Sequence, residues 1–179
     1  GVWQYLINAT PDEIRKLPLI RHDQTVDDLK VSQEARWLIG FWLNKAKSSP
    51  AKRPGAWMRK GFQGYQFWGE KIRERIAQQV PYIKHWKAEV SDYDSIPNVK
   101  ATWFVDPPYQ DKGQFYRMGS SEIDFPKLGQ WCRQLNGQVI VCENEGADWL
   151  PFRPFRTVKA TTKRGGKAAQ SVEVIWTKP

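Results

Sequence analysis

The chain has 179 residues, with 28 Lys and Arg against 19 Asp and Glu, a net charge of +9 and a pI near 9.6. This length predicts one domain. No run of residues suits a membrane-spanning helix or a signal peptide, so we expect no membrane partner and a cytoplasmic location. The positive charge favours nucleic acid as a partner, although many basic soluble proteins have none.

The cysteines and histidines exclude several kinds of site. Cys132 and Cys142 match no metal-ligand spacing and are too few for a disulfide framework, so buried free thiols are expected. His22 and His85 are isolated. The sequence therefore predicts neither a metal site nor a His-based catalytic triad.

The first third of the chain predicts helices. Residues 2–7 have helical apolar spacing, and Thr10 is a good N-cap for a helix to about residue 17. Residues 32–47 give the strongest helical pattern, with Ser32 as cap and an apolar stripe that indicates core rather than a ligand platform.

Residues 45–68 combine basic and aromatic side chains. A Pro- and Ser-rich stretch at 48–55 ends the helix and predicts an exposed loop, and residues 57–68 interleave Arg and Lys with Trp, Phe and Tyr. That mixture suits contact with phosphates and bases, and it also suits a solvated loop whose aromatics fold onto a helix. The candidate residues for contact with nucleic acid are Lys45, Lys47, Lys52, Arg53, Trp57, Arg59, Lys60 and Tyr65.

A further helix is predicted at residues 69–80. Its apolar side chains recur at helical spacing, which leaves Lys71, Arg73 and Arg75 available to phosphates or simply to water. Pro81 ends the helix, and a strand is predicted at residues 85–90.

The most informative stretch begins at residues 101–105, which predict a short buried strand. Asp106 follows, and Pro107 and Pro108 end the strand in a stiff turn because proline cannot donate to a sheet ladder. Open α/β sheets bind ligands at this edge. Asp106 and the Pro107 carbonyl oxygen can accept hydrogen bonds from the exocyclic amino group of a base, and Tyr109 can stack on a base turned out of its helix. The alternative is a plain strand-ending turn.

The remaining residues predict more α/β structure. After a loop, Asp124 caps a helix that runs through Leu135, and residues 138–143 predict a strand buried on both faces. This strand–helix–strand order implies a parallel pair. Residues 155–162 and 171–177 alternate as an antiparallel hairpin with a basic tip.

Asp-Pro-Pro-Tyr at 106–109 resembles the catalytic motif of amino-directed methyltransferases that use S-adenosylmethionine. From about residue 82 onward the chain resembles Dam-type, especially phage-encoded, DNA adenine-N6 methyltransferases. The wider resemblance rests on Gly113, Phe115, Tyr116 and residues 121–125, 138–144, 149–155 and 173–176.

The resemblance implies an α/β fold with a Rossmann-like class I methyltransferase sheet and a helical recognition insert. It implies methyl transfer from S-adenosylmethionine to a flipped adenine in double-stranded DNA. It also implies that the cytoplasm is that of a bacterial or phage-infected bacterial cell. Asp106, Pro107, Pro108 and Tyr109 would be catalytic, and Asp92, Tyr93 and Asp106 would contact the cofactor. Asp92 also suits a cap for the turn before Pro97. An RNA guanine-N2 methyltransferase and a non-catalytic DNA-binding remnant of the fold are the alternatives.

The resemblance also implies a division of the chain. Residues 1–31 would be N-terminal helices of the methyltransferase core, 32–80 the target-recognition segment and 81–179 the catalytic α/β part with its hairpin. The family's Gly-rich cofactor turn after a first strand has no counterpart here, so the sheet would be incomplete in its N-terminal half. Because residue 1 is Gly, we expect a preceding segment to supply that motif; a second chain is the other source.

Overall fold

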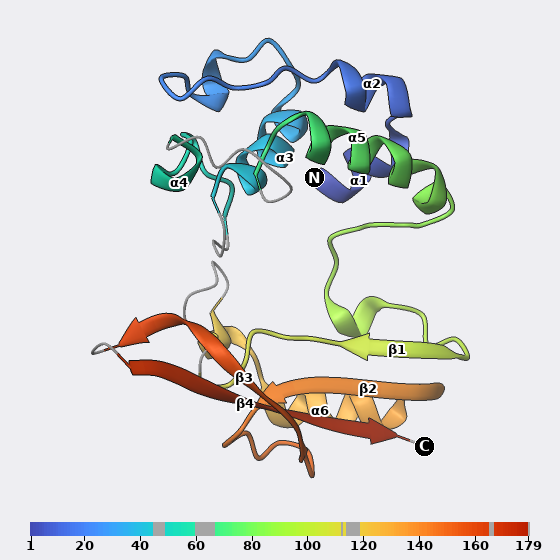
Figure 1. The fold of residues 1–179 in the computed structure, drawn as a ribbon. Helices are drawn as coiled ribbons and strands as arrows, with labels where there is room; N and C mark the ends of the chain where they lie inside the picture. The colour runs from blue at the N-terminus through green and yellow to red at the C-terminus, as the bar shows by residue number, and fades with distance from the viewer. Residues whose placement is uncertain (45–48, 60–66, 112, 114–118, 165–166, 179) are drawn as a thin grey trace. The chain divides into compact units, whose positions relative to one another are not determined.

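The computed structural model describes residues 1–44, 49–59, 67–111, 113, 119–164 and 167–178, apart from the side chains of residues 57, 159–164 and 167–169. The described chain forms two compact units, Gly1–Val90 and Ser91–Pro179, where the length predicted one domain. Figure 1 shows that the first unit contains helices and the second contains the sheet. No helix among the described residues is long and apolar enough to cross a bilayer.

The regular elements described in the first unit are all helical. They are α1 (Val2–Asn8), α2 (Pro11–Lys16), the 3₁₀ turn η1 (Val26–Asp28), α3 (Gln33–Leu43), α4 (Ala56–Arg59), α5 (Glu70–Gln79) and the 3₁₀ turn η2 (Val80–Ile83). The helices predicted before residue 80 are present, but α3 is shorter than expected because Asn44 is already extended.

Side-chain caps fix where two of these helices begin. The Thr10 hydroxyl accepts from the Glu13 N–H at 3.2 Å, and the Glu13 carboxylate accepts from the Thr10 N–H at 2.6 Å. The Ser32 hydroxyl accepts from the Ala35 N–H at 3.2 Å. Both caps satisfy N–H groups that have no partner within the helix, as predicted.

One hydrophobic core spans the first unit. Its most deeply buried side chains come from α2, α3, α5 and the residue two before α5: Ile14, Ile39, Leu43, Trp68 and Ile72. The core therefore draws on both residues 1–31 and residues 32–80. Their separation into a core segment and a recognition segment stays a prediction.

The prediction of a strand at residues 85–90 is wrong. The chain after η2 is irregular, and side chains hold it against α1. The Lys84 amino group donates to the Ile7 carbonyl at 2.8 Å, and the ring centroids of Trp86 and Trp3 are 5.7 Å apart. A strand needs a neighbour to pair its backbone groups, and the described part of the first unit contains no strand.

The second unit is a mixed α/β unit with one four-stranded sheet. Its elements are the 3₁₀ turn η3 (Tyr93–Ser95), β1 (Ala101–Val105), the 3₁₀ turn η5 (Ser120–Glu122), α6 (Phe125–Gln134), β2 (Gly137–Asn144), β3 (Arg153–Arg164) and β4 (Lys167–Lys178). The strand order is β1-β2-β4-β3 (Figure 1). β1 and β2 are parallel, and β4 is antiparallel to both β2 and β3. These findings confirm the predicted strand–helix–strand unit and the C-terminal hairpin.

The sheet is covered by α6 on one face. Val139 and Val141 of β2 are buried in a cluster with α6, whereas Ile140 is half-buried and Phe104 of β1 is 66% exposed. The prediction that β1 is buried, and that β2 is buried on both faces, is therefore wrong. β1 lies at the edge of this sheet, and alternate side chains of both strands point away from the α6 face.

The start of β2 requires glycine. Gly137 has a φ of 102°, and a Cβ there would lie 2.2 Å from the Ala101 carbonyl oxygen. Because Ala101 pairs with Gly137, this close approach sets the register of the parallel pair. The preceding helix α6 begins at the predicted cap, where the Asp124 carboxylate accepts from the Lys127 N–H at 2.9 Å.

Both cysteines are free, as expected. Cys132 on α6 is buried and Cys142 on β2 is half-buried. Burial raises the pKa of the Cys132 thiol to about 11, so it remains protonated at neutral pH and packs as a small apolar group.

Candidate functional site

The predicted turn follows β1 directly. β1 ends at Val105, so Asp106 and both prolines lie beyond the ladder. β2 runs parallel beside β1, so the carboxyl ends of both strands lie at the same edge of the sheet. The Gly113 N–H donates to the Tyr109 carbonyl at 2.6 Å, and a Cβ at Gly113 would lie 2.7 Å from the Pro108 carbonyl carbon. Glycine at position 113 thus lets the returning chain pack closely on the turn.

A buried carboxylate from β2 holds this turn in place. Glu143 is 1% exposed and accepts from the Gln110 N–H at 2.7 Å. It also accepts from the Asn144 N–H at 2.8 Å and from the Trp149 indole N–H at 3.2 Å. Three donors satisfy a charge that would otherwise be costly to bury. The chain immediately after Tyr109 is therefore tied to the end of β2.

Asp106 lies in an acidic, partly desolvated setting although its side chain is exposed. Burial by the surrounding protein, and then the negative charge of Glu173, raise the pKa of Asp106, while a hydrogen bond from the Tyr109 hydroxyl lowers it. Burial and the Asp106 charge raise the pKa of Tyr109. Burial and the negative charges of Asp106 and Glu173 raise the pKa of the Cys142 thiol. Asp106 is therefore a reachable acceptor that holds a proton more tightly than an ordinary Asp.

The side chain of Gln110 adds an amide to this edge of the sheet. Its Nε2 donates to the Asp148 carboxylate at 3.3 Å. Its Oε1 is buried and has no hydrogen-bond partner among the described residues. Among the described residues, therefore, only the Nε2 end of the Gln110 amide is held by a hydrogen bond.

Asp92 and Tyr93, the predicted cofactor contacts, lie at the start of η3. Asp92 occupies the cap position, but its carboxylate makes no capping hydrogen bond; its carbonyl oxygen instead accepts from the Ser95 hydroxyl at 2.7 Å. Within the described chain, no hydrogen bond or ion pair engages this carboxylate. The Tyr93 ring contacts Trp131 edge-on at 5.1 Å and packs against the core of the unit.

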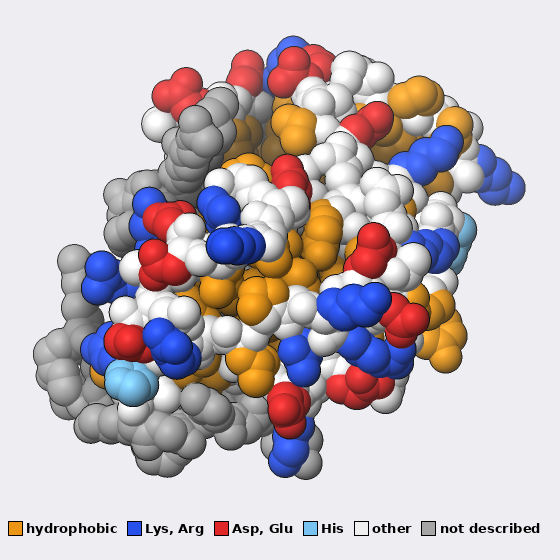
Figure 2. Space-filling model, turned by 90° about the horizontal axis from the view of Figure 1, so that it is seen from above, with side chains coloured by type: hydrophobic (Ala, Val, Ile, Leu, Met, Phe, Trp, Pro, Cys, Tyr) orange, Lys and Arg blue, Asp and Glu red, His pale blue; other side chains and the backbone are white. Residues whose placement is uncertain are grey.

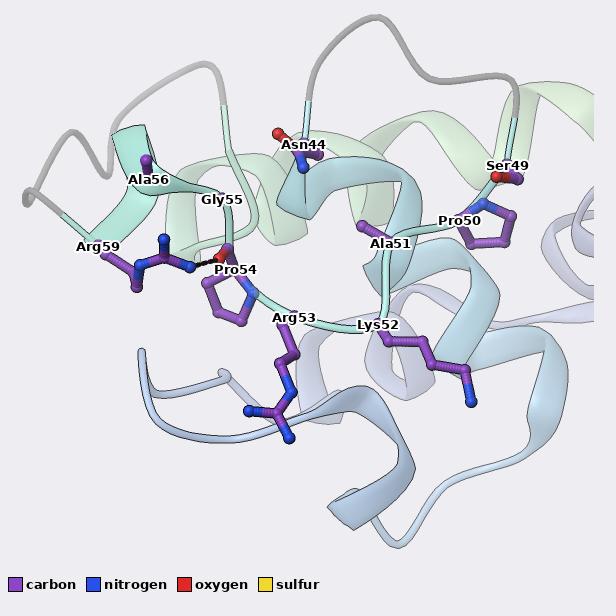
Figure 3. A pocket seen from close by; sticks show the side chains of 10 residues that line it. All are labelled: Asn44, Ser49, Pro50, Ala51, Lys52, Arg53, Pro54, Gly55, Ala56 and Arg59. Carbon is purple, nitrogen blue, oxygen red and sulfur yellow. Dashed lines mark hydrogen bonds between the residues drawn. The ribbon is translucent and has the colours of Figure 1, made fainter. Parts of the chain in front are cut away.

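Three of the predicted DNA contacts line one open pocket in the first unit (Figure 3). The pocket has a volume of about 490 Å³, and Lys52, Arg53 and Arg59 contribute its cations. The others fall outside the described structure: Lys45, Lys47, Lys60, Tyr65 and the side chain of Trp57.

The cations of α5 are partly engaged inside the unit. Arg73 donates to the Leu17 carbonyl at 2.7 Å, and the central carbon of the Arg75 guanidinium lies 5.3 Å from the ring centroid of Trp42. Figure 2 shows Lys and Arg side chains interspersed with Asp and Glu on the face that it displays. The net positive charge therefore does not form a single basic surface there.

Glu143, Glu173 and Gln110 were missed as site residues by the sequence analysis. The available signal for Glu143 was an acid at the carboxyl end of an otherwise apolar strand, beside the predicted turn. Glu173 gave no comparable signal, because its proximity to Asp106 depends on how β4 pairs with β2.

Comparison with models of protein families, with curated proteins and with solved structures finds no match to this chain.

Proposed function

We propose that the protein is a site-specific DNA adenine-N6 methyltransferase that uses S-adenosylmethionine. The observation that carries the proposal is the turn after β1, where an exposed Asp106 with a raised pKa is followed by two prolines and Tyr109. This turn lies at the sheet edge where α/β proteins bind ligands. The net charge of +9 suits a duplex substrate.

The turn offers acceptors for both hydrogens of an amino group. Asp106 and the Pro107 carbonyl oxygen would accept from the exocyclic amine of adenine and draw its nitrogen away from conjugation with the ring. Tyr109 would stack on the flipped base. The methylated nitrogen must lose a proton, and the raised pKa makes Asp106 a better acceptor for it than an ordinary carboxylate. Proximity and orientation supply most of the acceleration.

S-adenosylmethionine would supply an electrophilic methyl group on a positively charged sulfur. The unengaged Asp92 carboxylate suits the cofactor's adenine amino group as an acceptor, and Asp106 adds negative charge that suits its cationic groups. Tyr93 suits stacking less well than the resemblance implies, because its ring already packs against Trp131.

The topology supports a Rossmann-like class I methyltransferase fold. A parallel pair joined by α6 is followed by two antiparallel final strands, in the order β1-β2-β4-β3. Only β4 runs against the other three strands, and with β3 it forms the C-terminal hairpin that the resemblance implies. In this proposal the sheet unit carries catalysis, and the basic pocket of the helical unit belongs to DNA recognition.

The test is the identity of the methylated product. Purified protein is incubated with labelled S-adenosylmethionine and either unmethylated duplex DNA, the same duplex already methylated at adenine N6, or structured RNA. We expect labelled N6-methyladenine from the first substrate only. Label in RNA as N2-methylguanine would favour the RNA methyltransferase alternative. Salt-sensitive DNA binding without label would favour a non-catalytic DNA-binding protein.

A further inference from the structure

The loop that carries Lys52 and Arg53 is fixed on α3 by its backbone. The Ala51 N–H donates to the Gly40 carbonyl at 3.0 Å, and the Gly55 N–H donates to the Leu43 carbonyl at 3.1 Å. Gly40 permits this approach, since a Cβ there would lie 2.7 Å from the Ala51 carbonyl oxygen. The Lys52 carbonyl also accepts from the Val26 N–H at 2.9 Å. The pocket on this loop is therefore largely preformed.

The three cations of the pocket differ in how far other groups of the protein already bind them. Lys52 pairs with Asp27 at 3.0 Å, and Arg59 uses Nη1 to donate to the Pro54 carbonyl at 2.6 Å. Arg53 makes no hydrogen bond or ion pair within the described part of the chain. In Figure 3, the Arg59 side chain extends from α4 toward Pro54, whereas the Arg53 and Lys52 side chains leave the loop in other directions. Arg53 is thus the cation with most donors to offer.

The chemistry of the lining indicates an anion. None of the ten described lining residues is acidic, and the two guanidinium groups add planar, permanently charged donors that match phosphate oxygens. Pro50, Ala51, Pro54 and Ala56 contribute apolar surface without side-chain groups that could read base edges. Asn44 and Ser49 add polar side chains that could also meet a base, but the three cations make this lining suit an anionic phosphate better than an uncharged base edge.

We propose that this pocket receives a backbone phosphate of duplex DNA, with Arg53 as its main contact and Arg59 as the second. The choice of DNA as the polyanion rests on the proposed function. Lys52 is excluded as a main contact because Asp27 offsets its charge. The contact positions the duplex without reading its sequence.

The test measures binding of the whole chain to a fluorescent duplex across a salt series, for the wild type, Arg53→Ala, Arg53→Lys and Lys16→Ala. Lys16 is an exposed residue on α2, outside the pocket lining, so its variant removes the same charge from the same unit. Circular dichroism checks that each variant folds.

Arg53→Ala should weaken binding roughly tenfold near physiological salt, which is the scale of one lost charge-assisted contact. It should also lower the slope of log affinity against log salt by about 0.9. The loss should be equal on unrelated duplex sequences. Arg53→Lys should keep the slope and lose part of the affinity, because an ammonium lacks the fork geometry. Lys16→Ala should stay close to the wild type.

Equal affinity and slope for Arg53→Ala and Lys16→Ala would overturn the proposal, and so would a wild type that does not bind duplex DNA. The result is separable from the proposed function. If the Arg53 effects appear but the wild type transfers no methyl group, the phosphate site stands and the enzyme assignment fails. If the wild type methylates DNA while Arg53→Ala binds normally, the enzyme assignment stands and the phosphate site fails.

Discussion

The backbone N–H of Gln110 donates to the carboxylate of Glu143 at 2.7 Å. This bond joins the turn after β1 to the last residues of β2, across 33 positions of the sequence. The geometry of Asp106 and Tyr109 therefore depends on a buried acid that does not itself belong to the motif.

Replacing Glu143 should destabilise the fold. Glu143→Ala leaves the Gln110 N–H, the Asn144 N–H and the Trp149 indole without their acceptor. A buried donor without a partner costs about 1–3 kcal/mol, so the free energy of unfolding should fall by about 3 kcal/mol or more. Chemical denaturation of the isolated variant measures this change.

The control is Glu145→Ala, two residues further along. Glu145 is exposed, and a surface substitution of this kind changes stability by within about 0.5 kcal/mol. Equal stability of the two variants would show that Glu143 does not hold the turn.

Glu173→Gln should shift the pH profile of methyl transfer. Burial and the Glu173 charge raise the pKa of Asp106, so removing that charge lowers it. The proposed chemistry needs ionised Asp106, so the acid limb of the rate profile should move to lower pH. Rates measured from acidic to neutral pH test the shift. Glu145→Gln, the same substitution at an exposed position, should leave the limb in place.

The same shift has a consequence for stability. A raised folded-state pKa means that the native protein binds a proton at Asp106 more readily than the unfolded chain does. Ionised Asp106 therefore destabilises the fold at neutral pH, and this penalty is relieved as pH falls through the folded-state pKa. Asp106→Asn should raise the thermal midpoint at neutral pH and have less effect in acid. A lowered midpoint at neutral pH would contradict this account.

Gly137→Ala should disrupt the start of the parallel pair. The new Cβ would meet the Ala101 carbonyl oxygen at 2.2 Å, at a φ of 102° that other residues rarely adopt. We expect a loss of at least about 2 kcal/mol in the free energy of unfolding. Gly69→Ala is the contrasting case, because the nearest atom lies 3.8 Å from the new Cβ and the backbone is extended.

Features that depend on local sequence could be predicted. The caps at Thr10, Ser32 and Asp124 involve residues three apart in the sequence, and Pro107 ends β1 because of its own ring. Each signal acts within one turn of the chain, so no knowledge of the fold was needed.

Features that depend on distant neighbours could not be predicted. Residues 85–90 have a strand-like pattern but lack a strand partner in the described first unit, and alternate side chains of β1 are exposed because α6 covers only one face of the sheet. The electrostatic setting of Asp106 involves Glu173, which is 67 positions away in the sequence and reaches the site through the pairing of β2 with β4. The motif could be recognised in the sequence, but the distant residues that surround it in the fold could not.

The proposed role of Asp106 is tested by methyl transfer by Asp106→Ala under single-turnover conditions, measured together with this variant's affinity for duplex DNA. Asp111→Ala, which removes an exposed acid shortly after the motif, is the matched control. We expect Asp106→Ala to lose at least about a hundredfold in transfer rate. Its DNA affinity should be nearly unchanged, and Asp111→Ala should behave like the wild type. Retained transfer by Asp106→Ala would remove Asp106 from the catalytic role and contradict the account.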